Sequence, residues 1–216
     1  MRLAVFIAFA TALCQAESLS FQGKRYTYSL YHPSGENRPA VLLLHGAGGA
    51  GRDMLDVWKP FAKAHGIVLI APDLPRELAF EQIAPAFFMA VVGEVRGLDP
   101  RRIYVFGYSM GGYLAYDAAM FASDYFAAVA VYANFISPGY VSILKQAKRM
   151  IPIAIYAGVK DERIPVESVR GTRDLLQSQG FPVHYREFAK QGHDYGAVAK
   201  DVNADAWEFF ERARLP

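Results

Sequence analysis

A Gly-x-Ser-x-Gly segment lies at the centre of this chain, between a run of strand-forming residues and a run of helix-forming ones. Residues 103–106 (Ile-Tyr-Val-Phe) form a short apolar stretch that predicts a buried strand. The segment Gly107-Tyr108-Ser109-Met110-Gly111 follows directly, and small apolar residues recur at helical spacing after it. A strand, a sharp turn and a helix in this order would hold Ser109 in a strained conformation with its hydroxyl exposed. The alternative is an ordinary turn in which Ser109 caps the helix.

Apolar runs and amphipathic segments alternate along the rest of the chain. This alternation predicts an α/β fold with a mostly parallel central sheet and helices on both faces, and the 216 residues fit one domain. Pro60 and Pro85 are expected to kink or restart their helices. The further strands are expected at 21–31 (an edge strand or hairpin), 40–44, 67–71, 126–132, 151–157 and 183–188. The helices are expected at about 53–65, 78–95, up to 123, 140–149, 166–179 and from the loop 190–195 to about 212.

The first 16 residues have the layout of a secretory signal peptide. A positive start at Arg2 precedes an apolar run over residues 3–13, and the small residue Ala16 precedes Glu17. We therefore expect cleavage after Ala16, a catalytic domain over residues 17–216, and export to the periplasm or the medium. The apolar run is far shorter than the ~20 residues of a spanning helix, so no stable membrane anchor is expected.

Cys14 is the only cysteine of the chain. A lipid anchor on Cys14 is the alternative to simple cleavage, but Leu13 is bulky where a lipid-attachment site normally has a small residue. Cleavage after Ala16 would remove Cys14, so the predicted mature chain would have no thiol. That excludes disulfides, cysteine-based metal sites and a cysteine nucleophile.

The charge balance gives no reason to expect a nucleic-acid partner. The formal net charge is +2 and there is no block of like charge. Basic residues such as Lys145, Lys148 and Arg149 are expected on a solvated helix face. Since no His, Asp and Glu residues show ligand spacing, neither a metal nor another cofactor is expected.

Catalytic residues in such sheets lie on the loops that leave the carboxyl ends of the strands. Ser109 offers a hydroxyl nucleophile, which needs a general base, and His193 lies in the loop after the last predicted strand. Asp161 follows the strand before it and can bond the second imidazole nitrogen. Glu162 and Asp194 are the alternative acids.

A fourth loop, His45-Gly-Ala-Gly-Gly49, follows the predicted strand 40–44. Acyl transfer needs two backbone N–H groups aimed at the developing oxyanion, and we expect them from Ala47 and Met110. His45 is expected to orient its loop rather than to act as a second base.

Aromatic residues flank these loops at Tyr108, Phe135 and Tyr195. They are candidates for binding an aromatic acyl group by stacking, with a packing role as the alternative.

The chain resembles the α/β-hydrolase superfamily over essentially its whole predicted mature length. Within it, the chain is similar to small esterases with little or no lid, of the polyhydroxybutyrate-depolymerase, feruloyl-esterase, dienelactone-hydrolase and acyl-thioesterase kinds. The matching pieces are His45-Gly46, Gly107 to Gly111, Asp161 with Ile164-Pro165, and Gly192-His193. The resemblance implies a serine hydrolase that cleaves small or polymer-linked carboxylic esters through an acyl-enzyme, with short-chain or aromatic acyl groups in an open cleft.

Two other functions are compatible with this fold. A peptidase of the prolyl-oligopeptidase kind usually carries a large extra domain, for which this chain has no room. A non-catalytic binding protein is the second alternative, although a complete set of Ser109, Asp161 and His193 argues against it.

Overall fold

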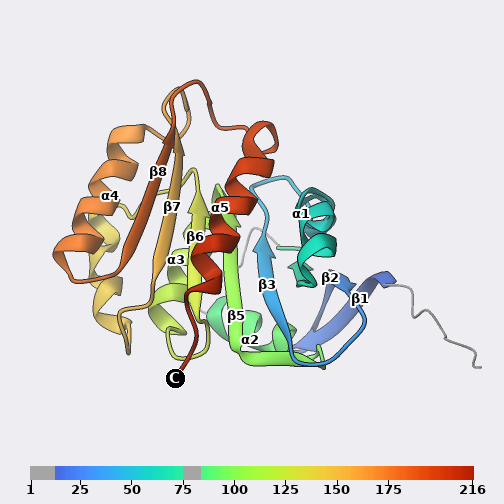
Figure 1. The fold of residues 1–216 in the computed structure, drawn as a ribbon. Coiled ribbons are helices and arrows are strands. Elements are labelled where there is room, and N and C mark those ends of the chain that lie inside the picture. The colour runs from blue at the N-terminus through green and yellow to red at the C-terminus, as the bar shows by residue number, and fades with distance from the viewer. Residues whose placement is uncertain (1–12, 75–83) are drawn as a thin grey trace, which may run out of the picture.

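The fold is built on one eight-stranded sheet, shown in Figure 1. The computed structural model describes residues 13–74 and 84–216, with the backbone alone for residues 13–15. The spatial order is β1-β2-β4-β3-β5-β6-β7-β8, and only β1–β2 and β2–β4 pair antiparallel. The mostly parallel sheet with an antiparallel hairpin at its edge is therefore confirmed. The strands are Leu13–Phe21 (β1), Lys24–His32 (β2), Arg38–Leu44 (β3), Val68–Pro72 (β4), Leu98–Tyr108 (β5), Ala128–Tyr132 (β6), Ile153–Gly158 (β7) and Val183–Phe188 (β8).

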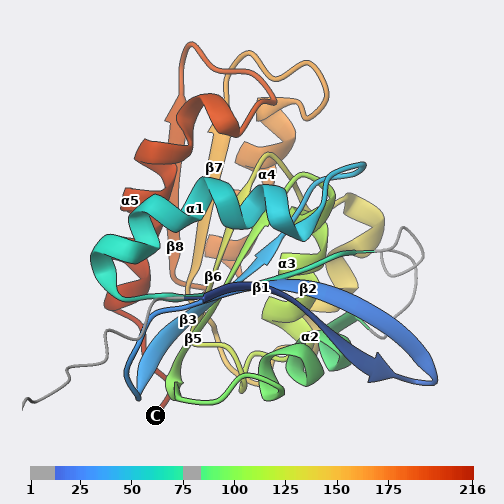
Figure 2. The same cartoon turned by 90° about the vertical axis from the view of Figure 1, so that its right-hand side faces the viewer.

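Helices cover both faces of this sheet. The α-helices are Gly51–His65 (α1), Ala84–Gly93 (α2), Met110–Phe121 (α3), Val166–Ser178 (α4) and Ala199–Glu211 (α5), and two 3₁₀ segments are Pro138–Gln146 (η2) and Gly196–Val198 (η3). Helices α1 and α5 pack on one face, and α2, α3 and α4 pack on the other, as the two views in Figures 1 and 2 show. This arrangement confirms the predicted α/β architecture.

Strand β3 illustrates why the central strands are apolar throughout. Leu42 and Leu44 pack into the core on the side of α2, α3 and α4, whereas Val41 and Leu43 pack into the core on the side of α1 and α5. All four side chains are fully buried, and each contributes about 1.5–3 kcal/mol by leaving water. Burial on both faces therefore requires apolar side chains at successive positions of the strand.

The register brings the carboxyl ends of the central strands level with one another. Leu44 at the end of β3 lies opposite Gly107 of β5, and Tyr108 lies opposite Tyr132 at the end of β6. The loops that leave β3, β5 and β6 therefore emerge side by side at one edge of the sheet.

Two helices differ from the sequence-based expectation. Helix α1 runs unbroken through Pro60, because the rest of the helix is held by a buried face that includes Leu55, Trp58 and Ala62. The α-helix expected over 140–149 is wrong: the segment forms 3₁₀ turns over Pro138–Gln146, with the i+3 bond from Tyr140 N to Ser137 O (2.9 Å). Helix α2 is described from Ala84 onward, so residues 78–83 of the predicted helix 78–95 lie outside the described residues.

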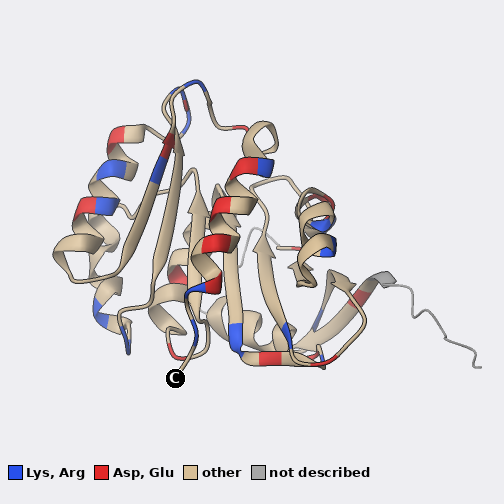
Figure 3. Cartoon of the chain, in the orientation of Figure 1, with Lys and Arg blue, Asp and Glu red and all other residues tan. Residues whose placement is uncertain are grey.

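The surface carries charges of both signs, and Lys and Arg share α4 and α5 with Asp and Glu (Figure 3). Of the three basic residues expected to be solvated, Lys145 is exposed and Lys148 pairs with Asp124 at the surface. Arg149 is a correction, because its guanidinium is half-buried. It donates to the carbonyls of Ser123, Phe126 and Ala127, at 2.5, 2.6 and 3.0 Å, and so joins the segment that follows η2 to the turn between α3 and β6.

Strand β1 contains the predicted cleavage position after Ala16. Residues 1–12 of the predicted signal peptide lie outside the described residues. Strand β1 is the edge of the sheet and pairs with β2 alone, so that cleavage would shorten the edge to residues 17–21 and leave the parallel strands unchanged. Within residues 13–74 and 84–216, no helix combines the length and apolar character needed to cross a membrane.

Candidate active site

Ser109 lies in the sharp turn between β5 and α3. Its backbone has φ 53° and ψ −118°, a conformation that a residue with a side chain rarely adopts. Such a backbone stores about 1–3 kcal/mol of strain, which the surrounding structure must offset. The predicted strand, sharp turn and helix are all present. Ser109 stands at the N-cap position of α3, but its side chain makes no cap hydrogen bond, unlike that of an ordinary capping serine.

The two glycines of the motif are needed for close approach rather than for a left-handed backbone. A Cβ on Gly107 would lie 2.2 Å from the carbonyl oxygen of Gly111, and a Cβ on Gly111 would lie 2.1 Å from that of Leu44. Both distances are far shorter than any van der Waals contact. The absence of these side chains lets α3 begin directly against the end of β3.

Asn134, after β6, supports the same turn and was not anticipated from the sequence. Its Nδ2 donates to the carbonyl of Ser109 at 2.7 Å, while its Oδ1 accepts from the N–H of Phe135 at 2.6 Å. The N–H of Ser109 donates to the carbonyl of Tyr132 at 3.0 Å. Ala133, just before Asn134, also has a positive φ of 58°. The end of β6 is therefore shaped to hold the turn that carries Ser109.

Three side chains form one hydrogen-bonded series. His193 Nε2 lies 2.9 Å from Ser109 Oγ, and His193 Nδ1 lies 2.8 Å from Asp161 Oδ2. The side chains of His193 and Asp161 are 13% and 2% exposed, so the bond between them is shielded from water. Glu162 and Asp194, the alternative acids, are both exposed, and Asp194 Oδ1 accepts from the N–H of Gly196. The residue that contacts the imidazole is therefore Asp161.

The second oxygen of Asp161 fixes the orientation of its carboxylate. Oδ1 accepts from the backbone N–H groups of Arg163 and Ile164, each at 2.9 Å. With Oδ1 held by two donors, Oδ2 is directed at the imidazole, and Nδ1–H donates to it. The other ring nitrogen, Nε2, is then free to accept the Ser109 proton.

The loops after β7 and β8 are joined by a hydrogen bond and by close backbone packing. Lys160 N donates to Gln191 O at 2.8 Å, and the hydroxyl of Tyr132 donates to Gly192 O at 3.0 Å. A Cβ on Gly158 would lie 2.3 Å from Gly192 O, so only glycine lets the loops approach this closely. These contacts bring Asp161 and His193 together although 32 positions separate them.

His45 anchors the loop that follows β3. A backbone N–H can only donate, so the 2.8 Å bond from Leu74 N makes His45 Nε2 the acceptor, and Nδ1–H donates to Gly46 O at 2.8 Å. Both ring nitrogens of this buried histidine are thus occupied, which agrees with the expected role in orienting the loop.

The anchored loop lies directly against the serine. A Cβ on Gly46 would be 3.0 Å from the Tyr108 ring and 3.3 Å from Ser109 Cβ. The N–H of Met110 belongs to the first turn of α3, where helical N–H groups have no partner within the helix. Ala47 is exposed at the tip of the loop. The assignment of the Ala47 and Met110 N–H groups to an oxyanion hole stays a prediction.

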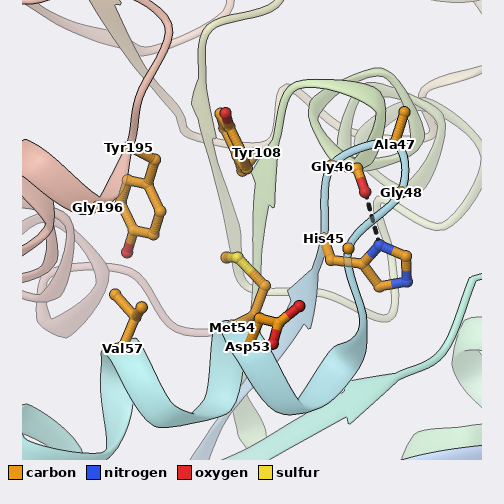
Figure 4. A pocket seen from close by; sticks show the side chains of 11 residues that line it. His45, Gly46, Ala47, Gly48, Asp53, Met54, Val57, Tyr108, Tyr195 and Gly196 are labelled. Atoms are coloured by element: carbon orange, nitrogen blue, oxygen red, sulfur yellow. Dashed lines mark hydrogen bonds between the residues drawn. The ribbon is translucent and has the colours of Figure 1, made fainter.

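A cavity of about 300 Å³ opens between the 45–49 loop, α1 and the turn at Tyr195 and Gly196, and Figure 4 shows its lining. Of the three aromatic residues proposed to contact substrate, Tyr108 and Tyr195 line this cavity. Burial raises the pKa of the Tyr108 hydroxyl, so this residue stays neutral. Tyr195 is 3% exposed and its hydroxyl donates to Asn203 Oδ1.

Phe135 belongs to a different hollow. It lines a depression with Pro138, Val141 and Leu175, between the loop after β6 and α4. The structure therefore brings Tyr108 and Tyr195 together and leaves Phe135 apart from them.

The chemistry that this arrangement can perform is nucleophilic attack by a hydroxyl whose proton has an acceptor 2.9 Å away. Within the described part of the chain, no group of three or more His, Cys, Asp or Glu side chains is placed to hold a metal ion.

Comparison with known proteins shows the family to which this chain belongs. The chain is 33% identical over 101 residues to the multifunctional-autoprocessing repeats-in-toxin of Vibrio cholerae, a match that covers 43% of this chain and 2% of that protein. It is similar in structure to the poly(3-hydroxybutyrate) depolymerase LpqC from Bordetella parapertussis (TM-score 0.74, 19% identity, 91% of each chain).

A second similar structure is the fluorophosphonate-binding serine hydrolase FphF from Staphylococcus aureus (TM-score 0.78, 14% identity, 92% of this chain and 98% of that one). At these identities the structural likeness establishes the fold. The model of the alpha/beta hydrolase family matches residues 41–214, which is most of the chain and includes every residue of the candidate site. The protein is therefore a member of the alpha/beta hydrolase family.

Proposed function

We propose that this protein is a serine esterase that hydrolyses carboxylic esters with Ser109 as nucleophile, His193 as general base and Asp161 as the acid that orients His193. The observation that supports it best is the series of hydrogen bonds Ser109–His193–Asp161, at 2.9 and 2.8 Å, at the strained turn. The names of the neighbours point the same way, since they include a polyester depolymerase and a fluorophosphonate-binding serine hydrolase.

In the first half-reaction, Ser109 Oγ attacks the carbonyl carbon of the ester while its proton passes to His193 Nε2. The new Oγ–C bond gives a tetrahedral oxyanion, which the N–H groups of Ala47 and Met110 stabilise. The bond from carbon to the alcohol oxygen then breaks, and His193 returns the proton to the departing alcohol. Asp161 remains ionised and stabilises the imidazolium.

In the second half-reaction, water takes the place of the alcohol. His193 accepts a proton from the water as its oxygen attacks the acyl carbon, and the bond to Ser109 Oγ breaks with return of that proton to the serine. The products are a carboxylic acid and the regenerated enzyme. No cofactor takes part in any step.

The test is hydrolysis of p-nitrophenyl acetate and butyrate by the wild type, Ser109→Ala, His193→Ala and the double variant. Each single change should lower kcat by roughly 10⁴-fold or more, and the double variant should be hardly worse, because residues that act as one relay do not contribute independently. Ser178→Ala, on the exposed end of α4, is the matched control and should keep full activity. Multiplying losses in the double variant would contradict the relay.

The same measurements separate this proposal from its alternatives. A peptidase of the prolyl-oligopeptidase kind should cleave a peptide p-nitroanilide faster than an ester of the same acyl group. A non-catalytic binding protein should hydrolyse none of these substrates, and Ser109→Ala should then change nothing.

We further propose that the protein is exported, with cleavage after Ala16. The support is the positive, apolar and small-residue pattern of the first 16 residues, and the position of the cut in an edge strand that pairs only with β2. The intact mass of the exported protein should correspond to a chain that begins at Glu17. A mass that retains Cys14 with attached lipid would contradict this.

A further inference from the structure

The cavity of about 300 Å³ in Figure 4 adjoins the nucleophile. Tyr108, the residue before Ser109, forms one wall, and the loop residues from His45 to Gly49 form another. Gly46 belongs to that loop and packs against both the Tyr108 ring and Ser109 Cβ. Ser109 does not line the cavity itself, so a group attached to a carbon bonded to Ser109 Oγ would reach it past Gly46 and Tyr108.

The walls of this cavity are apolar. Met54 and Val57 face it from α1, and the rings of Tyr108 and Tyr195 face it from the opposite side (Figure 4). The hydroxyl proton of Tyr195 is donated to Asn203, so this ring offers its carbon atoms to a ligand. Among the described residues that line the cavity, Asp53 is the only charged one.

We infer that this cavity is the acyl pocket and that it selects an uncharged, apolar acyl group of up to about ten carbons or one that carries an aromatic ring. This assignment rests on the proposed function. The carbonyl oxygen of the ester is held by the 45–49 loop, so the acyl chain starts at the wall that this loop forms. The alcohol leaves on the side of His193, which supplies its proton.

The volume sets the upper limit of acyl length. About 300 Å³ is at the small end of ligand pockets. It is about twice the volume of a ~150 Å³ cavity that holds one benzene ring, so it admits about ten carbons. Each CH₂ that enters the pocket should raise kcat/KM up to about fourfold, and further carbons should gain nothing once the pocket is full.

The carboxylate of Asp53 sets the charge preference. Its Oδ2 accepts from the N–H of Ala50 at 2.9 Å, which holds the group at the start of α1 beside the cavity. A second carboxylate at the end of an acyl chain would meet this like charge at short range, and the repulsion would be weakened by salt.

The first test varies the acyl chain of p-nitrophenyl esters from acetate to palmitate with the wild type, Val57→Trp and Val57→Ala. Val57 is 37% exposed at the rim, so its replacement leaves the core intact. We expect the wild-type kcat/KM to rise from acetate to octanoate or decanoate and to gain nothing beyond. Val57→Trp should lower the ratio of octanoate to acetate kcat/KM at least tenfold, and Val57→Ala should shift the optimum to longer chains. Ala64→Trp, at an exposed position of the same helix, is the control and should keep the wild-type profile.

The second test compares p-nitrophenyl butyrate with p-nitrophenyl hemisuccinate. The wild type should prefer butyrate, and Asp53→Asn should raise the hemisuccinate to butyrate ratio at least threefold at low salt, with a smaller gain at high salt. Asparagine can still accept from Ala50 N–H, so the start of α1 is preserved. Asp56→Asn, exposed on the same helix, is the control and should leave the ratio unchanged.

The outcomes separate the pocket from the proposed function. The pocket assignment is overturned if the wild type and Val57→Trp show the same dependence of kcat/KM on acyl length. It is also overturned if the Val57 variants change the dependence of kcat/KM on the alcohol group instead. The proposed esterase function is unaffected by either result. If the wild type hydrolyses none of these esters, both are overturned. A shift of the acyl optimum in opposite directions by Val57→Trp and Val57→Ala supports the pocket.

Discussion

The side-chain amide of Asn134 donates a 2.7 Å hydrogen bond to the backbone carbonyl of Ser109 and so joins the end of β6 to the strained turn after β5. Asn134→Asp keeps the acceptor for Phe135 N–H but replaces the donor with a charge that repels the Ser109 carbonyl. We expect kcat to fall about tenfold with KM little changed, because the nucleophile is displaced and the pocket is not. Steady-state kinetics on p-nitrophenyl butyrate measure this. Asn37→Asp, in an exposed turn, is the control, and equal kcat values for the two variants would contradict the role of Asn134.

The choice of acid can be tested by two neighbouring substitutions. Asp161→Asn should lower kcat by roughly 10³–10⁴-fold, because the residue bonded to Nδ1 sets the tautomer of His193. Glu162→Gln, at an exposed side chain, should stay within about twofold of the wild type. The reverse ranking would show that Asp161 is not the acid.

The close approach of α3 to β3 predicts that two glycine substitutions change the free energy of unfolding in opposite directions. Gly111→Ala places a Cβ 2.1 Å from Leu44 O and should cost at least about 3 kcal/mol of unfolding free energy, with loss of activity. Gly171→Ala adds a Cβ with no atom within 4 Å in the middle of α4, and should stabilise the protein by about 0.5–1 kcal/mol. Urea denaturation followed by tryptophan fluorescence measures both. Equal stabilities would contradict the described approach.

The sequence predicts the parts of this molecule that depend on local pattern. Apolar runs such as 40–44 predict buried strands, and the spacing around Ser109 predicts a strand, a turn and a helix, because these signals lie within one element. The 3₁₀ form of η2 has another origin. Tyr140 bonds Asp117 and Arg149 bonds the carbonyls after α3, so distant contacts fix the path of this segment at both ends.

Contacts between loops also cannot be predicted from a sequence pattern. Asn134 reaches a carbonyl 25 positions earlier, and no spacing rule links the two residues. Phe135 and Tyr195 have the same aromatic character, yet one lies in a hollow beside α4 and the other forms the wall of the pocket beside Ser109. Only the paths of the loops after β6 and β8 separate them.

A buried carboxyl predicts how stability depends on pH. Burial raises the pKa of Asp117 to about 6, although the hydroxyl of Tyr140 donates to its Oδ1 at 2.9 Å. The folded state then binds more protons than the unfolded state between about pH 4 and 6. The contribution of Asp117 to the free energy of unfolding is therefore fully present below about pH 4 and is lost as the pH rises through 6. Asp117→Asn should be more stable than the wild type by about 2–3 kcal/mol at pH 7.5 and nearly equal to it at pH 4. Urea titrations at both pH values measure this, with Asp56→Asn as the exposed control. A constant difference between Asp117→Asn and the wild type across this range would contradict it.

Covalent labelling by a fluorophosphonate tests whether Ser109 is an activated nucleophile. A fluorophosphonate forms a stable bond with a serine hydroxyl only where a base takes the proton and the phosphoryl oxygen is stabilised. Intact-mass analysis should find one label on the wild type, and peptide mapping should place it on Ser109. His193→Ala should slow labelling at least 10³-fold, and Ser109→Ala should take no label. A properly folded wild-type protein that remains unlabelled, or one labelled at another residue, would show that Ser109 is not the activated nucleophile.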